Sequence, residues 1–196
     1  MEERARSIVL AAIELAEEGG FEGVRLRDVA ARAGVALGTL YRRFRSKEDL
    51  LLAALELQVW SHQQQFETEP PAGPSAEARV TAFFRTTTEA MCSRPQLARA
   101  LVRAIVAGGP ELSQRVAAFH GHIEELITRA LRGDGVAPDL PPTEHERQVA
   151  HVLLRVWFAS LIGWASGLQG VAEVVEETES AARLIIGEST ALARSA

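Results

Sequence analysis

The clearest concentration of chemically useful side chains lies between positions 25 and 47. One acid, Asp28, stands there among seven cations: Arg25, Arg27, Arg32, Arg42, Arg43, Arg45 and Lys47. The chain as a whole has a formal net charge of −5, which taken alone argues against a nucleic-acid partner. A local basic patch on an acidic protein is nevertheless a footprint for a DNA backbone. A solvated basic face on an ordinary helical hairpin would account for the same charges.

Nucleophiles and metal ligands lack the spacing that catalysis requires. His120 and His122 lie two residues apart, so on a helix they point in different directions, and no cysteine or third histidine is near in sequence. Ser166 lacks the glycines two residues before and after that a nucleophile elbow needs. The single cysteine, Cys92, cannot form an internal disulfide, which fits a reducing compartment. We predict no catalytic residue, no metal site and no cofactor.

The elements that hold these groups are predicted to be helices. The 196 residues are 47% hydrophobic and 24% charged, which is typical of a globular protein, and apolar residues recur with the helical period. Glycines and prolines divide the chain into about nine helices. They are expected at roughly 3–18, 27–33, 36–43, 46–66, 76–92, 95–107, 110–132, 144–166 and 171–193. The fold class is therefore all-α, and no apolar run is long enough to span a membrane.

Two pairs of residues predict where helices begin. Ser46 with Asp49, and Thr143 with Glu146, have the spacing of capping boxes. The N-terminus shows no secretory signal, because acids follow the first methionine and no apolar run succeeds them. We expect a cytoplasmic protein with no membrane partner.

Residues 24–45 have the spacing of a helix-turn-helix. Val29, Ala30 and Ala33 give the first helix a small packing face, and Gly34 forms the turn. Val35, Leu40 and Phe44 are expected in the core between the helices. The outer face of the second helix would then carry Leu37, Gly38, Tyr41 and Arg42. Small and polar residues on that face allow a helix to enter a major groove.

The ordered motifs around this unit resemble those of TetR-family transcriptional regulators. They are Gly19-Gly20-Phe21, residues 29–35, residues 38–44 and residues 46–51, so the resemblance covers about a quarter of the chain. It implies a homodimeric regulator, usually a repressor, that releases a DNA operator when a small ligand binds. It also implies a DNA-binding domain at 1–48 and a ligand-binding and dimerisation domain at 49–196.

The same resemblance implies DNA-contacting residues. Leu37, Gly38 and Thr39 would lie at base edges. Tyr41, Arg43 and Lys47 would contact phosphates, with Arg42 beside them, and Arg27 would reach the backbone or a base. The sequence departs from the family pattern at Arg25 and Ala36, where capping hydroxyls are usual. Leu37 replaces a frequent polar residue, and Arg43 replaces a second tyrosine.

Apolar stripes after residue 75 predict either plain core or, by the family resemblance, a pocket for a lipophilic ligand. The candidate lining residues are Phe83, Phe84, Thr87, Met91, Leu101, Ile105, Phe119, Ile123, Trp157, Leu161 and Trp164. Residues 155–164 and 181–187 resemble the steroid-catabolism repressors of the family, which implies an acyl-CoA effector. Arg94, Arg99 and Arg103 could hold its phosphates, but surface salt bridges explain them equally well.

The last two helices are expected to form the homodimer interface, with packing inside one subunit as the alternative. A dimer would place two recognition helices about 34 Å apart on a near-palindromic operator. A second functional hypothesis is a small-molecule or acyl-CoA binding module, or an enzyme, without operator-specific DNA binding.

Overall fold

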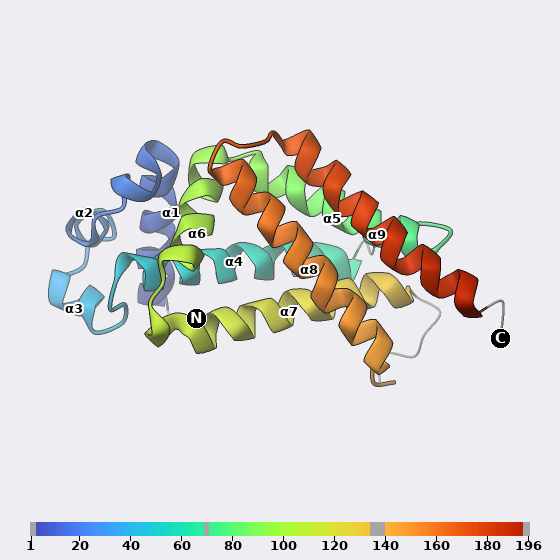
Figure 1. Cartoon of the computed structure of the whole chain (residues 1–196). Helices are drawn as coiled ribbons and strands as arrows, with labels where there is room; N and C mark the ends of the chain where they lie inside the picture. The colour runs from blue at the N-terminus through green and yellow to red at the C-terminus, as the bar shows by residue number, and fades with distance from the viewer. Residues whose placement is uncertain (1–2, 69–70, 134–139, 194–196) are drawn as a thin grey trace. The chain divides into compact units, whose positions relative to one another are not determined.

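A computed structural model describes residues 3–68, 71–133 and 140–193, with side chains except at 61–65, 67–68 and 188–193. The described residues form nine α-helices, a short 3₁₀-helix η1 and no strand, which confirms the predicted fold class (Figure 1). The helices are α1 (Glu3–Gly23), α2 (Leu26–Arg32), α3 (Leu37–Tyr41), α4 (Lys47–Thr68), α5 (Ala76–Cys92), α6 (Pro95–Ala107), η1 (Pro110–Leu112), α7 (Ser113–Arg132), α8 (Glu144–Ala165) and α9 (Val171–Ala193).

The predicted boundaries hold to within a few residues, with two differences. Helix α1 continues to Gly23, but its backbone leaves the helical conformation at Gly19 and Gly20, where the sequence predicted its end. Helix α3 is shorter than predicted and covers only Leu37–Tyr41. The predicted break at 69–75 and the predicted loop at 133–142 lie partly outside the described residues.

The chain forms two compact units. The first contains the described residues up to His62 together with Met91–Ala117, and the second contains Gln63–Ala90 together with the described residues from Ala118 onward. In the first unit, α1 packs extensively on α6 and also contacts α2. The start of α4 is buried there as well, through Leu50, Leu51 and Leu52.

The connection between α2 and α3 is a tight turn centred on Gly34. The amide of Val35 donates to Ala30 O at 3.0 Å and the amide of Gly34 to Ala31 O at 3.3 Å, which is the Schellman pattern of a helix end. Gly34 has a φ of +67°, a left-handed conformation that a side chain would strain. This turn sets the direction in which α3 leaves α2.

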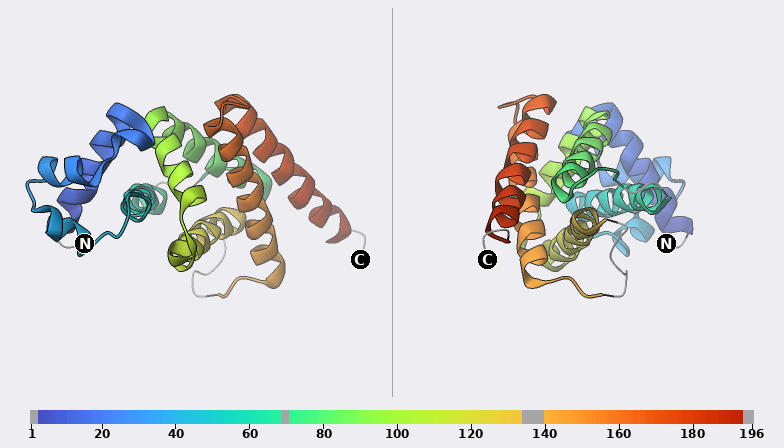
Figure 2. Two further views of the ribbon diagram at one scale, coloured as in Figure 1. Left: turned by 60° about the vertical axis from the view of Figure 1, so that its left-hand side comes forward. Right: turned by 90° about the vertical axis from the view of Figure 1, so that its right-hand side faces the viewer.

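The second unit contains α8, α9, all but the last two residues of α5, most of α7 and the end of α4. Helices α8 and α9 run as an antiparallel pair joined at Gly167, and they lie together in every view (Figures 1 and 2). Among the described helices, α8 alone is long and apolar enough to cross a membrane by length and composition. Leu153, Trp157 and Leu161 on α8 are buried in the unit, while its outer face carries His151 and Arg155, as in the core helix of a globular protein.

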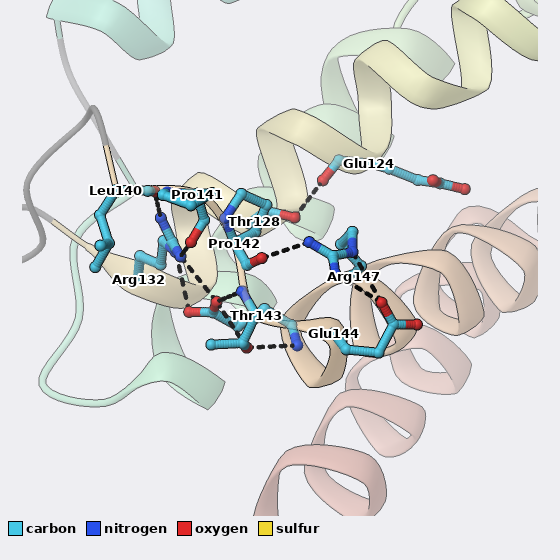
Figure 3. Close-up of polar contacts among 10 residues, drawn as sticks. Glu124, Thr128, Arg132, Leu140, Pro141, Pro142, Thr143, Glu144 and Arg147 are labelled. Atoms are coloured by element: carbon cyan, nitrogen blue, oxygen red, sulfur yellow. Dashed lines mark hydrogen bonds and ion pairs between the residues drawn. The ribbon is translucent and has the colours of Figure 1, made fainter.

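A polar cluster fixes the start of α8 to the end of α7 (Figure 3). Thr143 and Glu146 form the predicted capping box, in which each side chain bonds the other residue's backbone amide. The Arg132 guanidinium donates to both carboxylate oxygens of Glu146, at 3.0 and 2.9 Å, and to the carbonyls of Leu140 and Pro141. These bonds, led by that from Arg132, lower the pKa of Glu146 to about 2.

Candidate DNA-binding surface and ligand-binding interior

Helix α3 presents two different faces. Leu40 is fully buried against α2, and Phe44 is 7% exposed just beyond the helix. The opposite face carries Leu37 and Tyr41, which are 38% and 54% exposed. Gly38 lies between them, and a Cβ placed on it would meet no atom within 4 Å. The predicted outer face of α3 is therefore exposed. Val35, which the sequence predicted in the core, is only half-buried.

The helix pair lacks two of its usual caps. Arg25 is the N-cap of α2 and makes no side-chain cap hydrogen bond within the described residues. Ala36 occupies the same position before α3 and has no side-chain acceptor. A missing cap costs about 1 kcal/mol. The pair consequently depends on the Gly34 turn and on burial of residues such as Val29 and Leu40.

The predicted cations differ in their exposure and in the contacts of their side chains. Arg27, Arg42 and Arg43 are exposed, and Arg42 also donates to Thr39 Oγ1 at 3.3 Å. Arg32 instead bonds both carboxylate oxygens of Glu18 on α1, at 2.6 and 3.0 Å. Arg32 therefore stabilises the contact between α1 and α2 rather than extending the outward-facing patch.

Lys47, a predicted phosphate contact, is partly enclosed. Its Nζ lies 3.8 Å from the centre of the Phe21 ring and 3.5 Å from Glu22 Oε2. Arg103 of α6 shares both partners, with its guanidinium 4.4 Å from the Phe21 ring and 2.8 Å from Glu22 Oε1. We call these four residues the Glu22 clamp. The sequence identified Phe21 and Lys47 separately and gave no indication of their contact.

The first turn of α4 is fixed by a second charged group. Asp49 accepts from the backbone amide of Arg45 at 2.9 Å, and its own amide donates to Ser46 Oγ at 3.1 Å. One half of the predicted capping box is therefore present, whereas the Asp49 side chain accepts from the backbone amide of Arg45 rather than from that of Ser46. Arg115 of α7 ion-pairs with Asp49 and also with Glu56, at 2.7 Å from Glu56 Oε2. The first turns of α4 are thus connected to the start of α7.

The second unit has an aromatic interior that contains most of the predicted ligand-binding residues. Phe83 and Phe84 are buried, with ring centres 5.2 Å apart, and Phe84 lies 5.7 Å from Trp157. Ile123, Leu161 and Trp164 are also buried, whereas Thr87 and Phe119 are half-buried. The structure therefore brings Phe83, Phe84 and Trp157 of the predicted set together.

The remaining predicted ligand-binding residues, Met91, Leu101 and Ile105, belong to the first unit. Cys92 beside them is 9% exposed, and burial raises the pKa of its thiol to about 11, so the thiol stays protonated and unreactive at neutral pH. Arg94 and Arg103, considered for CoA phosphates, form ion pairs with Glu17 and Glu22. The salt-bridge interpretation accounts for both.

The predicted dimer helices carry both buried and exposed apolar residues. Val174 and Ala182 are fully buried within their own unit, as internal packing predicts. Val152, Leu168 and Leu184 are 44%, 83% and 66% exposed. Among the described residues there is no group of three or more His, Cys, Asp or Glu side chains that could hold a metal ion.

A short helix with an exposed outer face, joined to the preceding helix by a tight glycine turn and flanked by exposed arginines, is typical of a helix-turn-helix DNA-binding protein. Residues 8–54 match the bacterial regulatory proteins of the tetR family, and residues 73–185 match the tetracyclin repressor-like C-terminal domain. The chain belongs to the TetR family of transcriptional regulators.

Individual relatives agree with this assignment. The chain is 31% identical to the HTH-type transcriptional repressor KstR of Mycobacterium tuberculosis, over 95% of this chain and 82% of that protein. This match confirms the predicted similarity to steroid-catabolism repressors. A TetR transcriptional regulator from Rhodococcus sp. RHA1 superposes with a TM-score of 0.81 at 26% identity, covering 94% of this chain and 97% of that one.

A further solved structure, Thermus thermophilus FadR in complex with lauroyl-CoA, has a TM-score of 0.68 at 22% identity. The superposition covers 93% of each chain. At that identity the likeness concerns the fold alone. Its ligand is a property of that protein.

Proposed function

We propose that this TetR-family protein is a cytoplasmic homodimeric repressor that leaves a near-palindromic operator when a lipophilic or acyl-CoA effector binds. The observation that carries the DNA-binding part is the outward face of α3. Leu37, Gly38 and Tyr41 are exposed on that face. Arg42 and Arg43 are exposed beside them. Leu37 can contact a thymine methyl but cannot hydrogen-bond a base. The arginines attract phosphates.

The effector would occupy the aromatic interior of the second unit. Phe83, Phe84 and Trp157 supply the apolar surroundings that binding of a lipophilic molecule requires. The KstR resemblance and the acyl-CoA complex of the FadR with the same fold both favour an acyl-CoA. A ligand that weakens operator binding must itself bind less tightly to the operator complex.

Dimerisation through α8 and α9 would cover the exposed Val152, Leu168 and Leu184. The two recognition helices of such a dimer would lie about 34 Å apart, on successive turns of the major groove. The proposed domain boundary remains near residue 48, with ligand binding and dimerisation assigned to the domain at 49–196.

A gel-shift titration against the DNA upstream of the protein's own gene and its neighbours tests the DNA-binding part. We expect a saturable shift that Tyr41→Ala weakens by about tenfold, the loss of one phosphate contact and its packing. Affinity should fall steeply with salt. Trp60→Ala is the matched control, because Trp60 is an aromatic residue of similar exposure, 57%, on α4 outside the α3 face. Equal affinity in the Tyr41→Ala and wild-type proteins would exclude this face as the DNA-reading surface.

The effector part needs a separate readout. Conservative changes inside the aromatic interior, Phe84→Leu and Trp164→Phe, should alter release by acyl-CoA while leaving operator affinity intact. An unchanged response in both variants would remove these residues from the pocket. A protein that binds acyl-CoA but shifts no operator would instead be a binding module.

A further inference from the structure

Two adjacent threonines on α5, Thr87 and Thr88, differ in the hydrogen bonding of their hydroxyl groups. Thr88 is fully buried, and its Oγ1 accepts a hydrogen bond from Trp157 Nε1 at 2.9 Å. The Oγ1 of Thr87 is buried too, yet it has no hydrogen-bond partner among the described residues. Buried hydroxyls are satisfied in the great majority of cases, so Thr87 is an exception that requires an explanation.

His120 on α7 is a second exception of the same kind. The residue is 8% exposed, and its Nε2 has no hydrogen-bond partner among the described residues. Its ring packs against Phe119 at 6.0 Å and edge-on to Phe158 at 5.3 Å. The neighbouring histidines differ, since His122 lies 3.8 Å from Glu125 and the exposed His151 bonds Glu124 at 2.8 Å.

Thr87 and His120 lie at similar distances along their helices from one contact between α5 and α7. Helices α5 and α7 run in opposite directions, and Arg79 at the start of α5 bonds the Ala130 carbonyl near the end of α7 (Figure 1). From that contact, Thr87 is about 12 Å along α5 and His120 about 15 Å back along α7. Thr88, the neighbour of Thr87, bonds Trp157, and His120 packs on Phe158, so α5 and α7 both contact the same turn of α8 near these two residues.

We propose that Thr87 and His120 are specificity-determining contacts to one uncharged oxygen, a carbonyl or hydroxyl, on the apolar part of the effector. This rests on the proposed function, because it names the chemistry of the ligand for the same interior. A hydroxyl and an imidazole nitrogen can each donate to a carbonyl oxygen. Binding such an oxygen would satisfy two buried polar atoms that have no partner among the described residues.

The charge of the His120 imidazole favours binding of an uncharged oxygen over binding of a carboxylate. Burial lowers the pKa of His120, and the nearby Arg155 lowers it further, which favours the neutral imidazole. Burial is the largest cause of the lowered pKa. His151 also lowers the pKa of His120, whereas Glu124 raises it. A neutral imidazole offers hydrogen bonding without a counter-charge. The oxygen could belong to a thioester or to a ring ketone, and the experiment separates these sources.

Calorimetric titration with two matched pairs of probes tests the inference. Lauroyl-CoA is compared with S-dodecyl-CoA, which lacks the carbonyl, and cholest-4-en-3-one with cholest-4-ene. We expect the wild-type protein to prefer the oxygenated member of at least one pair by about tenfold, the effect of one buried hydrogen bond with its unsatisfied alternative. The pair that shows the preference identifies the source of the oxygen.

The isosteric variant Thr87→Val should reduce this preference to within about twofold by weakening only the oxygenated probe, and His120→Phe should do the same. Thr88→Val is the matched control. It makes the same chemical change one residue away but leaves Trp157 Nε1 without its acceptor, so it should lower Tm. Thr87→Val should leave Tm unchanged or raise it, because the hydroxyl that it removes has no partner among the described residues.

Three outcomes would overturn the inference: no preference in either pair, a preference that survives both variants, or equal weakening of both members of a pair. The operator gel shift is run on the same proteins. A wild-type protein that shifts its operator without any preference for oxygen would refute this inference and leave the proposed regulator standing. A wild-type protein that shifts no operator but keeps the preference for the oxygenated probe would refute the proposed regulator and leave this inference standing.

Discussion

The two compact units differ in whether their buried polar atoms have hydrogen-bond partners. In the first unit, charged residues pair with one another at the contacts between helices, as Arg32 does with Glu18 and Arg115 with Asp49. In the interior of the second unit, Thr87 and His120 keep buried polar atoms without partners among the described residues. Helices α2 and α3 are short and lack side-chain caps, so contacts with neighbouring elements must hold them in place.

This difference determines whether the residues that stabilise each unit are also the residues proposed to bind its ligand. A surface that reads DNA keeps its recognition groups outside the fold, so the fold must be complete without them. An interior that receives a ligand places its recognition groups inside, where each unpaired polar atom reduces stability until the ligand arrives. Substitutions in the first unit should therefore affect either stability or binding, whereas those at Thr87 and His120 should affect both in opposite directions.

The largest effect is expected from opposite faces of α3. Leu40→Ala removes a fully buried side chain and should lower the free energy of unfolding by about 2–5 kcal/mol. Leu37→Ala, on the 38% exposed face, should change it by less than about 0.5 kcal/mol but weaken operator binding. Urea denaturation and gel shift measure the two quantities. Comparable destabilisation by both variants would show that α3 does not have separate structural and reading faces.

An intermediate effect is expected from the Arg132–Glu146 contact of the second unit (Figure 3). The pKa of Glu146 is about 2 in the folded protein, below its ordinary value of 4.5. A lowered pKa stabilises the fold above about pH 4.5, and that stabilisation is lost as the pH falls towards 2. Glu146→Gln should cost about 2 kcal/mol at pH 7 and flatten the decline of stability between pH 4.5 and 2.

Thermal unfolding at pH 7, 4.5 and 3 measures this change, with Glu177→Gln as a control. Glu177 also has a lowered pKa, but because of Ser160 and Gln169 rather than an arginine. A pH profile of Glu146→Gln as steep as that of the wild-type protein would mean that other carboxyl groups dominate acid unfolding.

The same cluster shows how far the sequence could predict the structure. The capping box of Thr143 and Glu146 was predictable because its partners are three residues apart in one helical turn. The helices, the Gly34 turn and the outward residues of α3 were predictable for the same reason, since short-range spacing determines them. Arg132 is 14 residues from Glu146, and Lys47 is 26 from Phe21, so only the packing of separate helices brings them together.

The unpaired atoms were beyond sequence reasoning for a related cause. The pattern placed Thr87 on an apolar stripe and treated His120 only as a weak metal ligand. Whether a polar atom is buried, and whether a partner reaches it, depends on the rotation of each helix about its axis by a few tens of degrees. The helical period does not specify that rotation closely enough.

The smallest effect, and the one opposite in sign, is expected from the Glu22 clamp of the first unit. If Lys47 contacts a phosphate as proposed, the Glu22 carboxylate would compete with DNA for it, because Lys47 Nζ lies 3.5 Å from Glu22 Oε2. Exposed ion pairs contribute at most about 1 kcal/mol, so Glu22→Gln should tighten operator binding by about two- to fivefold. One additional phosphate contact would also steepen the dependence of log K on log salt by about 0.9.

Two variants make this prediction decisive. In a Lys47→Met background, Glu22→Gln should give a much smaller gain, because the double-mutant cycle isolates the interaction of the two residues. Glu77→Gln removes the same charge from the second unit, where Glu77 is paired with Arg183 at 3.8 Å, and so controls for net charge. If Glu22→Gln instead weakens operator binding, the clamp positions Lys47 for its phosphate, and the acid belongs to the DNA-binding surface rather than opposing it.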